Sequence, residues 1–336
     1  MLTDQILPAL RARAPAAPRT PARPRGLGLA LLLAGACLFP FLADGFVVFQ
    51  ITQLLVYAIA ILGLNLLTGT SGQFSLGHGA FFAAGAYVAA ILISEFGVPF
   101  PLAIVAAGAV CFGLGLGFGF PALKLDGIYL ALATFALAVA TPQILKLSLL
   151  EHWTGGVSGI ILDKPEPPAG LPLDADQWLY FVTLVTGGAL YWLVCNMVAG
   201  STGRAFRAVK DNPLAAASMG VPVTRVKVLA FGYSALITGV AGALSALVIQ
   251  FVAPDSFHVW LSIGLLVGLV IGGVGWLPGA LVGAAFITFV PGLAESVSQG
   301  LQGVVYGLFL IAAVYLAPRG AGGLIARFKA WRSRRA

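Results

Sequence analysis

Long apolar runs, separated by short polar stretches, constrain the fold of this chain more than any other feature. The run over residues 46–67 has 22 residues. As a helix rising about 1.5 Å per residue, it would cross the roughly 30 Å hydrocarbon core of a bilayer. Only 9% of the 336 residues are charged, whereas a soluble domain carries about 25%. Because barrel strands alternate apolar and polar residues, the unbroken runs predict an all-α polytopic membrane protein.

About ten segments are expected to be transmembrane elements, some of them tilted or incomplete. They are residues 27–43, 46–67, 80–95, 100–120, 128–147, 178–199, 228–250, 260–274, 278–293 and 303–317. A Gly-rich break at residues 272–283 interrupts the long apolar run over residues 260–293. It could be the counterpart of a polar break near residue 70. Closely spaced glycines let helices pack tightly in lipid. We therefore expect a helical bundle with broken helices.

Basic residues predict the orientation of the chain. They collect in three blocks, at residues 1–26, 200–227 and 319–336. Six crossings followed by four place all three blocks in the cytoplasm, as the positive-inside rule requires. We expect a disordered basic cytoplasmic tail at 1–26, a transmembrane domain over 27–318, a basic cytoplasmic tail at 319–336, and the acidic, Pro-rich loop 148–177 outside. Charge clustered in this way indicates membrane topology and not a nucleic-acid partner.

The middle basic block contains a predicted short helix. Polar Asp211 and Asn212 can cap its start, and Pro213 suits its first turn. Residues 214–219 would form the helix, and Gly220 would end it. A helix held among basic residues at a membrane face is well placed to dock on another protein. The alternative is an ordinary cytoplasmic loop that only determines topology.

A polar stretch lies within the apolar zone, over residues 63–87, GLNLLTGTSGQFSLGHGAFFAAGAY. Polar groups at membrane depth are either buried in protein or line a wet cavity. We expect this stretch to be a broken helix beside a translocation pathway. The alternative is a turn at the cytoplasmic face. The predicted pathway residues are Asn65, Thr68, Ser71, Gln73, Ser75 and His78.

Three stretches of the chain together resemble one family. They are residues 63–87, the run WTGGVSGI at 153–160, and GRAFRAVKDNPLAAASMG at 203–220. They resemble the branched-chain amino acid branch of ABC-importer permeases, in particular its M-type subunit. Ala215-Ala216 followed by Gly220 looks like the EAA loop of these permeases, although Leu214 stands where the usual Glu would be.

This resemblance implies a function and a set of partners. The chain would form half of the pore of an ATP-driven importer in a bacterial cytoplasmic membrane, for branched-chain or related amino acids. Its partners would be a homologous permease subunit, two cytoplasmic ATP-binding subunits and an extracytoplasmic solute-binding protein. The implied ATPase-coupling residues are Arg204, Arg207, Lys210, Asp211, Asn212, Pro213, Ala215, Ala216 and Gly220. The implied outer-loop residues beside the binding protein are Trp153, Thr154, Gly155, Gly156 and Gly159.

Enzymatic chemistry is not expected in this chain. No Gly-Lys pair is present for a phosphate-binding loop, so ATP and Mg²⁺ would be bound by partner subunits and no cofactor by this chain. A hydrolase built on Ser75 and His78 would lack a nucleophile elbow.

A secondary transporter or channel without ATPases is the main alternative function, but it would need an ion-coupling group in the membrane, and no convincing buried carboxylate is present. A membrane scaffold is disfavoured by the polar stretch.

Overall fold

The computed structural model describes residues 25–125, 127–168 and 171–297, with scattered residues between 304 and 323. The chain divides into two units, Met1–Leu42 and Ala43–Ala336. In the first unit, α2 (Arg25–Leu42) is one helix with Pro40 in its last turn. The two predicted basic tails lie mostly outside the described residues, and the predicted element 303–317 is described only at scattered helical positions.

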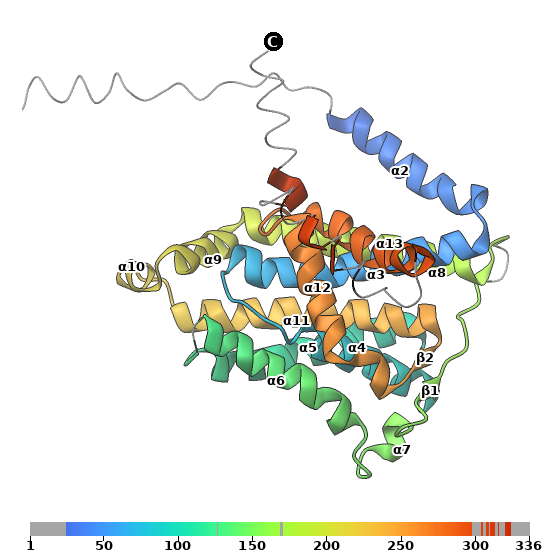
Figure 1. Cartoon of the computed structure of the whole chain (residues 1–336), viewed down its shortest axis with the longest axis horizontal. Helices are drawn as coiled ribbons and strands as arrows, with labels where there is room; N and C mark the ends of the chain where they lie inside the picture. Colours follow the sequence, from blue (N-terminus) through green and yellow to red (C-terminus); the bar gives the residue numbers. More distant parts are fainter. Residues whose placement is uncertain are drawn as a thin grey trace, which may run out of the picture. The chain divides into compact units, whose positions relative to one another are not determined.

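The second unit is a bundle of helices (Figure 1). Helix α3 (Gly45–Leu64) continues into a π-helical segment, η1 (Asn65–Thr70). The helices that follow are α4 (His78–Ser94), α5 (Phe100–Ala122), α6 (Ile128–Leu145), α7 (Glu151–Thr154), α8 (Ala175–Ala199), α9 (Ser201–Asp211), α10 (Pro213–Ser218), α11 (Val223–Ile249), the 3₁₀ turn η2 (Pro254–Phe257), α12 (Val259–Gly272) and α13 (Gly279–Val297). Strands β1 (Ile160–Ile161) and β2 (Phe251–Val252) form one short antiparallel pair, so the all-α prediction is right apart from these residues.

Helix α11 occupies the centre of this unit and packs against α3, α4 and α5. Its residues from Phe231 to Val248 are buried almost without interruption, which fits a helix that is apolar on all sides. Glycines allow α4 and α11 to approach closely. A Cβ atom on Gly85 would lie 2.5 Å from the Gly239 Cα, and one on Gly242 would lie 2.8 Å from the Phe82 carbonyl carbon.

The predicted number of about ten membrane elements is not confirmed. Among the described residues, six helices are long and apolar enough to cross a membrane, and two shorter apolar helices accompany them. The shorter ones are His78–Ser94 and Gly279–Leu293. Both follow directly after a break, at residues 71–77 and 273–278. The six longer spans are Gly45–Thr70, Phe100–Ala122, Ile128–Leu145, Ala175–Ala199, Val223–Ile249 and Pro254–Gly272.

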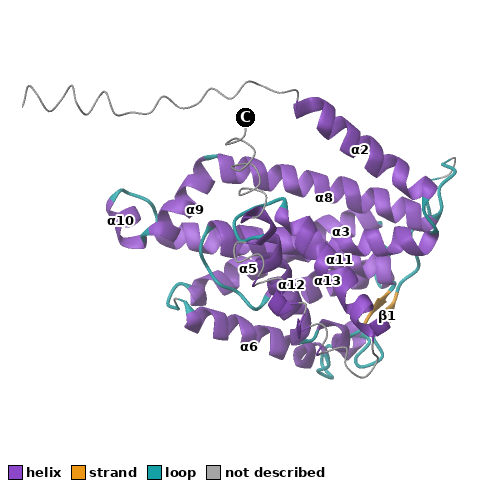
Figure 2. Ribbon diagram, turned by 45° about the horizontal axis from the view of Figure 1, so that its top comes forward, coloured by secondary structure: helices purple, strands orange, loops and turns teal. Residues whose placement is uncertain are grey.

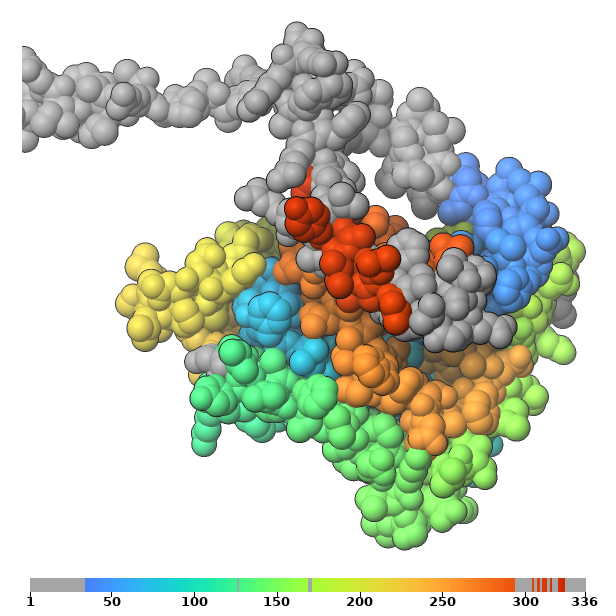
Figure 3. Space-filling model, viewed as in Figure 1, coloured from blue at the N-terminus to red at the C-terminus, as the bar shows by residue number. Residues whose placement is uncertain are grey.

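The two predicted functional loops lie at opposite ends of the bundle. Helices α9 and α10 project at one end, called here the α10 end, whereas α7 and the β1–β2 pair lie at the other, the strand end (Figures 1 and 2). In the space-filling view, the yellow atoms of α9 and α10 form a protrusion beyond the other helices (Figure 3). This arrangement separates residues 200–227 from residues 148–177 by the length of the helices.

Candidate functional site

Helix α9 is amphipathic, and the residues of its buried face are spaced three apart. Gly203, Phe206 and Val209 are buried, and this face packs on α8, α11 and η1. The predicted coupling residues Arg204, Arg207 and Lys210 lie on the exposed side of the same helix. The middle basic block is therefore mainly a helix lying against the bundle and not an extended loop.

The predicted start and stop of the next helix, α10, are confirmed. The Asn212 side chain accepts a hydrogen bond from the Ala215 amide at 3.0 Å, and Pro213 is the first helical residue. Gly220 has φ +83°, a left-handed conformation that glycine adopts without steric cost. Asp211 is the last residue of α9, so Asn212 alone caps α10.

The exposed face of α10 differs from the predicted face. Ala216 is buried against its own chain, whereas Ala215 is exposed. Leu214 and Met219 are each 84% exposed. Large apolar side chains in this position are typical of an interaction surface. The sequence analysis did not single out Leu214 or Met219, although Leu214 stands where the usual Glu of this loop would be.

The predicted break in the polar stretch is present. The chain leaves α3 through the π-helical segment η1, runs without helix from Ser71 to Gly77, and then enters α4. Because Lys210 of α9 contacts Gly69, the break lies toward the α10 end. The six predicted pathway residues, Asn65, Thr68, Ser71, Gln73, Ser75 and His78, are all buried.

A relay of hydrogen bonds runs through His78. Ser234 donates to the Gly63 carbonyl at 2.7 Å, so its oxygen accepts from His78 Nε2 at 2.6 Å. This assigns the proton to Nε2 and leaves His78 Nδ1 to accept from Ser75, 3.0 Å away. The relay joins α3, α4 and α11, and no carboxylate takes part in it.

The remaining polar side chains connect the break to its surroundings. Gln73 Nε2 donates to the Ser71 hydroxyl at 2.9 Å and to the Lys227 carbonyl at 3.3 Å. Thr68 donates to the Gln73 carbonyl at 3.1 Å. These donors are thus partnered within the chain, whereas Gln73 Oε1 is buried without a hydrogen-bond partner. Contact between them and a transported solute stays a prediction.

A cavity of about 850 Å³ lies elsewhere, between α3, α12 and α13. Its wall is mostly apolar and includes Leu261, Val267 and Ile287. Tyr57, Ser256 and His258 add polar groups to this wall, and Ser256 and His258 lie close to β2 in the sequence. None of the six buried polar residues of the break lines this cavity.

At the strand end, the predicted outer-loop residues form a compact turn. The Trp153 ring stacks on Phe96 with ring centroids 5.8 Å apart, and Thr154 donates to the Leu145 carbonyl at 2.9 Å. Gly155, Gly156 and Gly159 all have positive φ. A Cβ atom on Gly159 would lie 2.5 Å from the Val252 carbonyl oxygen. The glycines therefore permit the close approach of β1 to β2.

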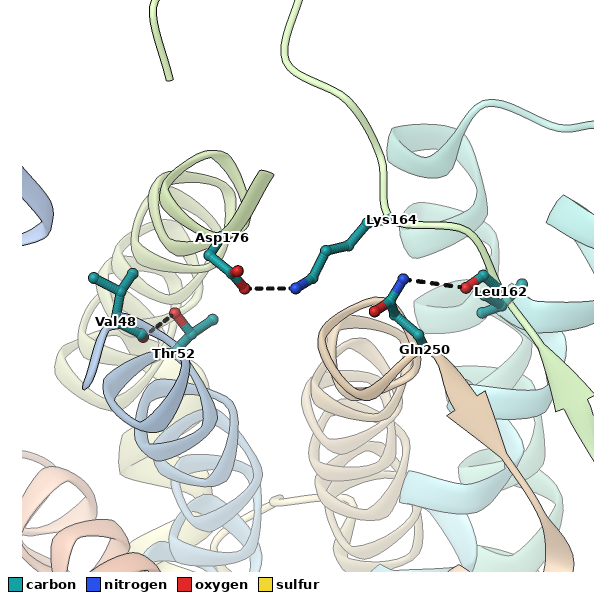
Figure 4. A network of polar contacts seen from close by, with 6 residues as sticks. All are labelled: Val48, Thr52, Leu162, Lys164, Asp176 and Gln250. Carbon is teal, nitrogen blue, oxygen red and sulfur yellow. Dashed lines mark hydrogen bonds and ion pairs between the residues drawn. The ribbon is translucent and has the colours of Figure 1, made fainter. Parts of the chain in front are cut away.

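The rest of the outer loop is anchored by two polar contacts (Figure 4). Lys164 Nζ forms a salt bridge with Asp176, at the start of α8, at 2.7 Å. The Leu162 amide donates to the Gln250 carbonyl at 2.8 Å, and the Gln250 side chain returns a hydrogen bond to the Leu162 carbonyl at 3.4 Å. These contacts tie the loop to α8 and to the end of α11.

A bundle of membrane-length helices with a projecting helix pair at one end and an anchored loop at the other indicates a multi-pass membrane protein. The model of the family described as the permease component of branched-chain amino acid transport systems matches residues 46–314. The chain belongs to this family.

Individual relatives agree with the M-type resemblance. The chain is 31% identical over 315 residues to the high-affinity branched-chain amino acid transport system permease protein LivM of Salmonella typhimurium strain LT2, covering 86% of this chain and 73% of the relative. It is 33% identical over 275 residues to LivM of Escherichia coli K12, covering 74% and 64%. Identity to the LivH permease protein of Escherichia coli K12 is 23% over 291 residues, covering 80% and 91%. No solved structure matches the chain.

Proposed function

We propose that this chain is the M-type permease subunit of an ATP-driven importer of branched-chain amino acids in a bacterial cytoplasmic membrane. A homologous permease subunit would complete the pore. Two cytoplasmic ATP-binding subunits would bind ATP and Mg²⁺, and an extracytoplasmic binding protein would deliver the amino acid. Family membership and the printed names of the LivM relatives support the transport role and the substrate.

The exposed apolar face of α10 is the observation that carries the coupling role. Leu214 and Met219 protrude beyond the bundle, and the adjacent Ala215 is small enough for close approach. Burial of apolar surface in a partner's cleft is favourable by about 25 cal/mol per Å². In the proposed orientation, the α10 end and both termini face the cytoplasm, as the positive-inside rule favours.

The mechanism follows from this orientation. The binding protein docks at the strand end, where Trp153 and the turn at Gly155 and Gly156 are held against the bundle. ATP binding and hydrolysis move the ATP-binding subunits. Helices α9 and α10 transmit this movement to the helices that enclose the pathway. The buried polar stretch supports the shape of the break beside that pathway.

Co-purification of the ATP-binding subunits tests the α10 contact. Leu214→Ala and Met219→Ala should each weaken their binding to the permease about tenfold, because truncating a central apolar anchor typically costs more than 1 kcal/mol. Leu149→Ala is the matched control, because Leu149 is 85% exposed but precedes α7 at the strand end. Binding is measured by titrating purified ATP-binding subunits onto the immobilised permease pair.

Two results would contradict the proposal. Unchanged affinity in the doubly substituted Leu214→Asp, Met219→Asp protein would remove α10 from the contact. Failure of the wild-type permease pair to bind any ATP-binding subunit, or to support leucine uptake with them, would remove the importer function itself.

A further inference from the structure

Three segments that are far apart in the sequence meet at the α10 end of the bundle. They are the end of α9, the π-helical segment η1, and the turn at residues 273–278 between α12 and α13. Lys210, Gly69 and Asn65 make the contacts between them. The first break in the apolar zone thereby contacts the second, Gly-rich break.

The first contact joins α9 to η1. Lys210 Nζ donates to the Gly69 carbonyl at 2.7 Å, and the Lys210 stem packs on Gly72, whose added Cβ would lie 2.7 Å from the Lys210 Cγ. Carbonyls at the end of a helix lack partners within it, and a cation there is favourable. Because α10 follows α9 after one residue, a displacement of α10 acts directly on this bond.

The second contact joins η1 to the turn between α12 and α13. Asn65 Nδ2 donates to the Trp276 carbonyl at 3.0 Å, while its Oδ1 accepts from the Gly275 amide at 2.8 Å. A primary amide can satisfy a neighbouring donor and acceptor at once, which a carboxylate or an aliphatic side chain cannot. Gly69 brings the two backbones together, because an added Cβ would lie 2.6 Å from the Gly275 nitrogen.

The turn that Asn65 contacts is built on glycines. Gly273 and Gly275 both have positive φ, +106° and +83°, a backbone conformation that glycine adopts without steric cost. Both helices that leave it belong to the wall of the 850 Å³ cavity. A movement of η1 would therefore be passed to the end of α12 and the start of α13, which are held together by the close contact of Gly272 with Gly279.

We propose that Lys210 and Asn65 are positioning residues that link movement of the coupling helices to the turn between α12 and α13. This inference rests on the proposed function, since it needs ATP-binding subunits that move α10. It predicts that breaking either contact separates ATP hydrolysis from transport and leaves the assembly of the complex intact. If the two contacts only stabilised the fold, the variants would give a less stable complex with a normal amount of leucine transported per ATP hydrolysed.

The test uses the full complex in proteoliposomes with its binding protein, and measures leucine transported per ATP hydrolysed. Lys210→Met keeps the aliphatic stem and removes only the donor, so this ratio should fall about tenfold, the factor for loss of a charged hydrogen bond. Lys210→Arg retains a donor and should restore much of the ratio. Arg225→Met is the matched control, because it removes an exposed positive charge at the same end of the bundle, at the start of α11.

A second variant keeps the proposal falsifiable. Asn65→Leu should lower the same ratio of leucine transported to ATP hydrolysed. In the double variant with Lys210→Met, this ratio should be no lower than in the more impaired single variant, because both substitutions act on one connection. Three results would overturn the link. They are normal transport per ATP in Lys210→Met, an equal fall in Arg225→Met, and additive losses in the double variant. Loss of the ATP-binding subunits from Lys210→Met would also overturn it, and would leave the proposed function standing. A wild-type complex that binds no ATP-binding subunit would instead refute the proposed function.

Discussion

The close contact of α4 with α11 provides a sharp test of how this bundle is held together. The change is Gly85→Ala. An added Cβ would lie 2.5 Å from the Gly239 Cα and 2.6 Å from the Gly239 carbonyl carbon. Carbon atoms in favourable contact are about 3.5–4.0 Å apart, so the two helices must separate by about 1 Å. Both neighbours are backbone atoms, which cannot rotate away as a side chain can.

The magnitude follows from two opposing effects. Overpacking of this kind typically costs about 1–3 kcal/mol. Replacing a helical glycine by alanine returns about 0.5–1 kcal/mol through helix propensity. Separation of α4 from α11 also lengthens the His78–Ser234 hydrogen bond, which is 2.6 Å in the intact contact. We therefore expect a net destabilisation of about 1–2 kcal/mol, which is about a 5- to 30-fold change in the unfolding equilibrium.

The assay is denaturant unfolding of the detergent-purified permease. Gly113→Ala on α5 is the control, because nothing lies within 4 Å of the Cβ that it would add. The control should unfold at the wild-type midpoint or above it, and Gly85→Ala clearly below it. If Gly85→Ala matched the wild type, or if both variants lost the same stability, the argument from close backbone packing would be refuted.

Two further predictions concern topology and the histidine relay. In a protein with Cys37 and Cys195 replaced, Asp163→Cys should react with an impermeant reagent in intact cells, and Ser218→Cys should react only after permeabilisation. The reason is that the loop after β1 and helix α10 lie at opposite ends of the bundle (Figure 1). The reverse labelling pattern would invert the proposed orientation. Ser234→Ala leaves His78 Nε2 and the Gly63 carbonyl without their buried partner, so it should destabilise the permease by about 1–3 kcal/mol; wild-type thermal stability would show that the relay contributes nothing to the fold.

Local signals explain which predictions from sequence succeeded. The start and end of α10 depend on the cap at Asn212, on Pro213 and on the left-handed turn at Gly220, all of which act within a few residues. The direction that α10 faces depends on tertiary packing instead. For that reason the predicted contact residue Ala216 proved to be buried, and the exposed Leu214 and Met219 were missed.

Long-range partners explain what could not be predicted. The polar stretch was expected to be a broken helix beside a translocation pathway or a turn at the cytoplasmic face, and both expectations follow from the same residues. Asn65 finds its partners at Gly275 and Trp276, more than 200 positions away, and no local pattern identifies such a pair. The start of α11 at Val223, five residues before its predicted start, has a similar origin, because Val226 and Val228 are buried in the bundle.

The packing of α11 also bears on how movement would leave the coupling helices. Helix α11 begins soon after α10, so it offers a direct route from the α10 end into the bundle. That route is stiff, because α11 is enclosed by α3, α4 and α5 and touches α4 through glycine backbones. Displacing it would break the closest contacts of the core. The connection through Lys210 and Asn65 instead reaches a glycine-dependent turn. Movement of α10 should therefore reach α12 and α13 through these two side chains, and α12 and α13 should move together, because a Cβ on Gly283 would lie 2.5 Å from the Gly268 carbonyl carbon.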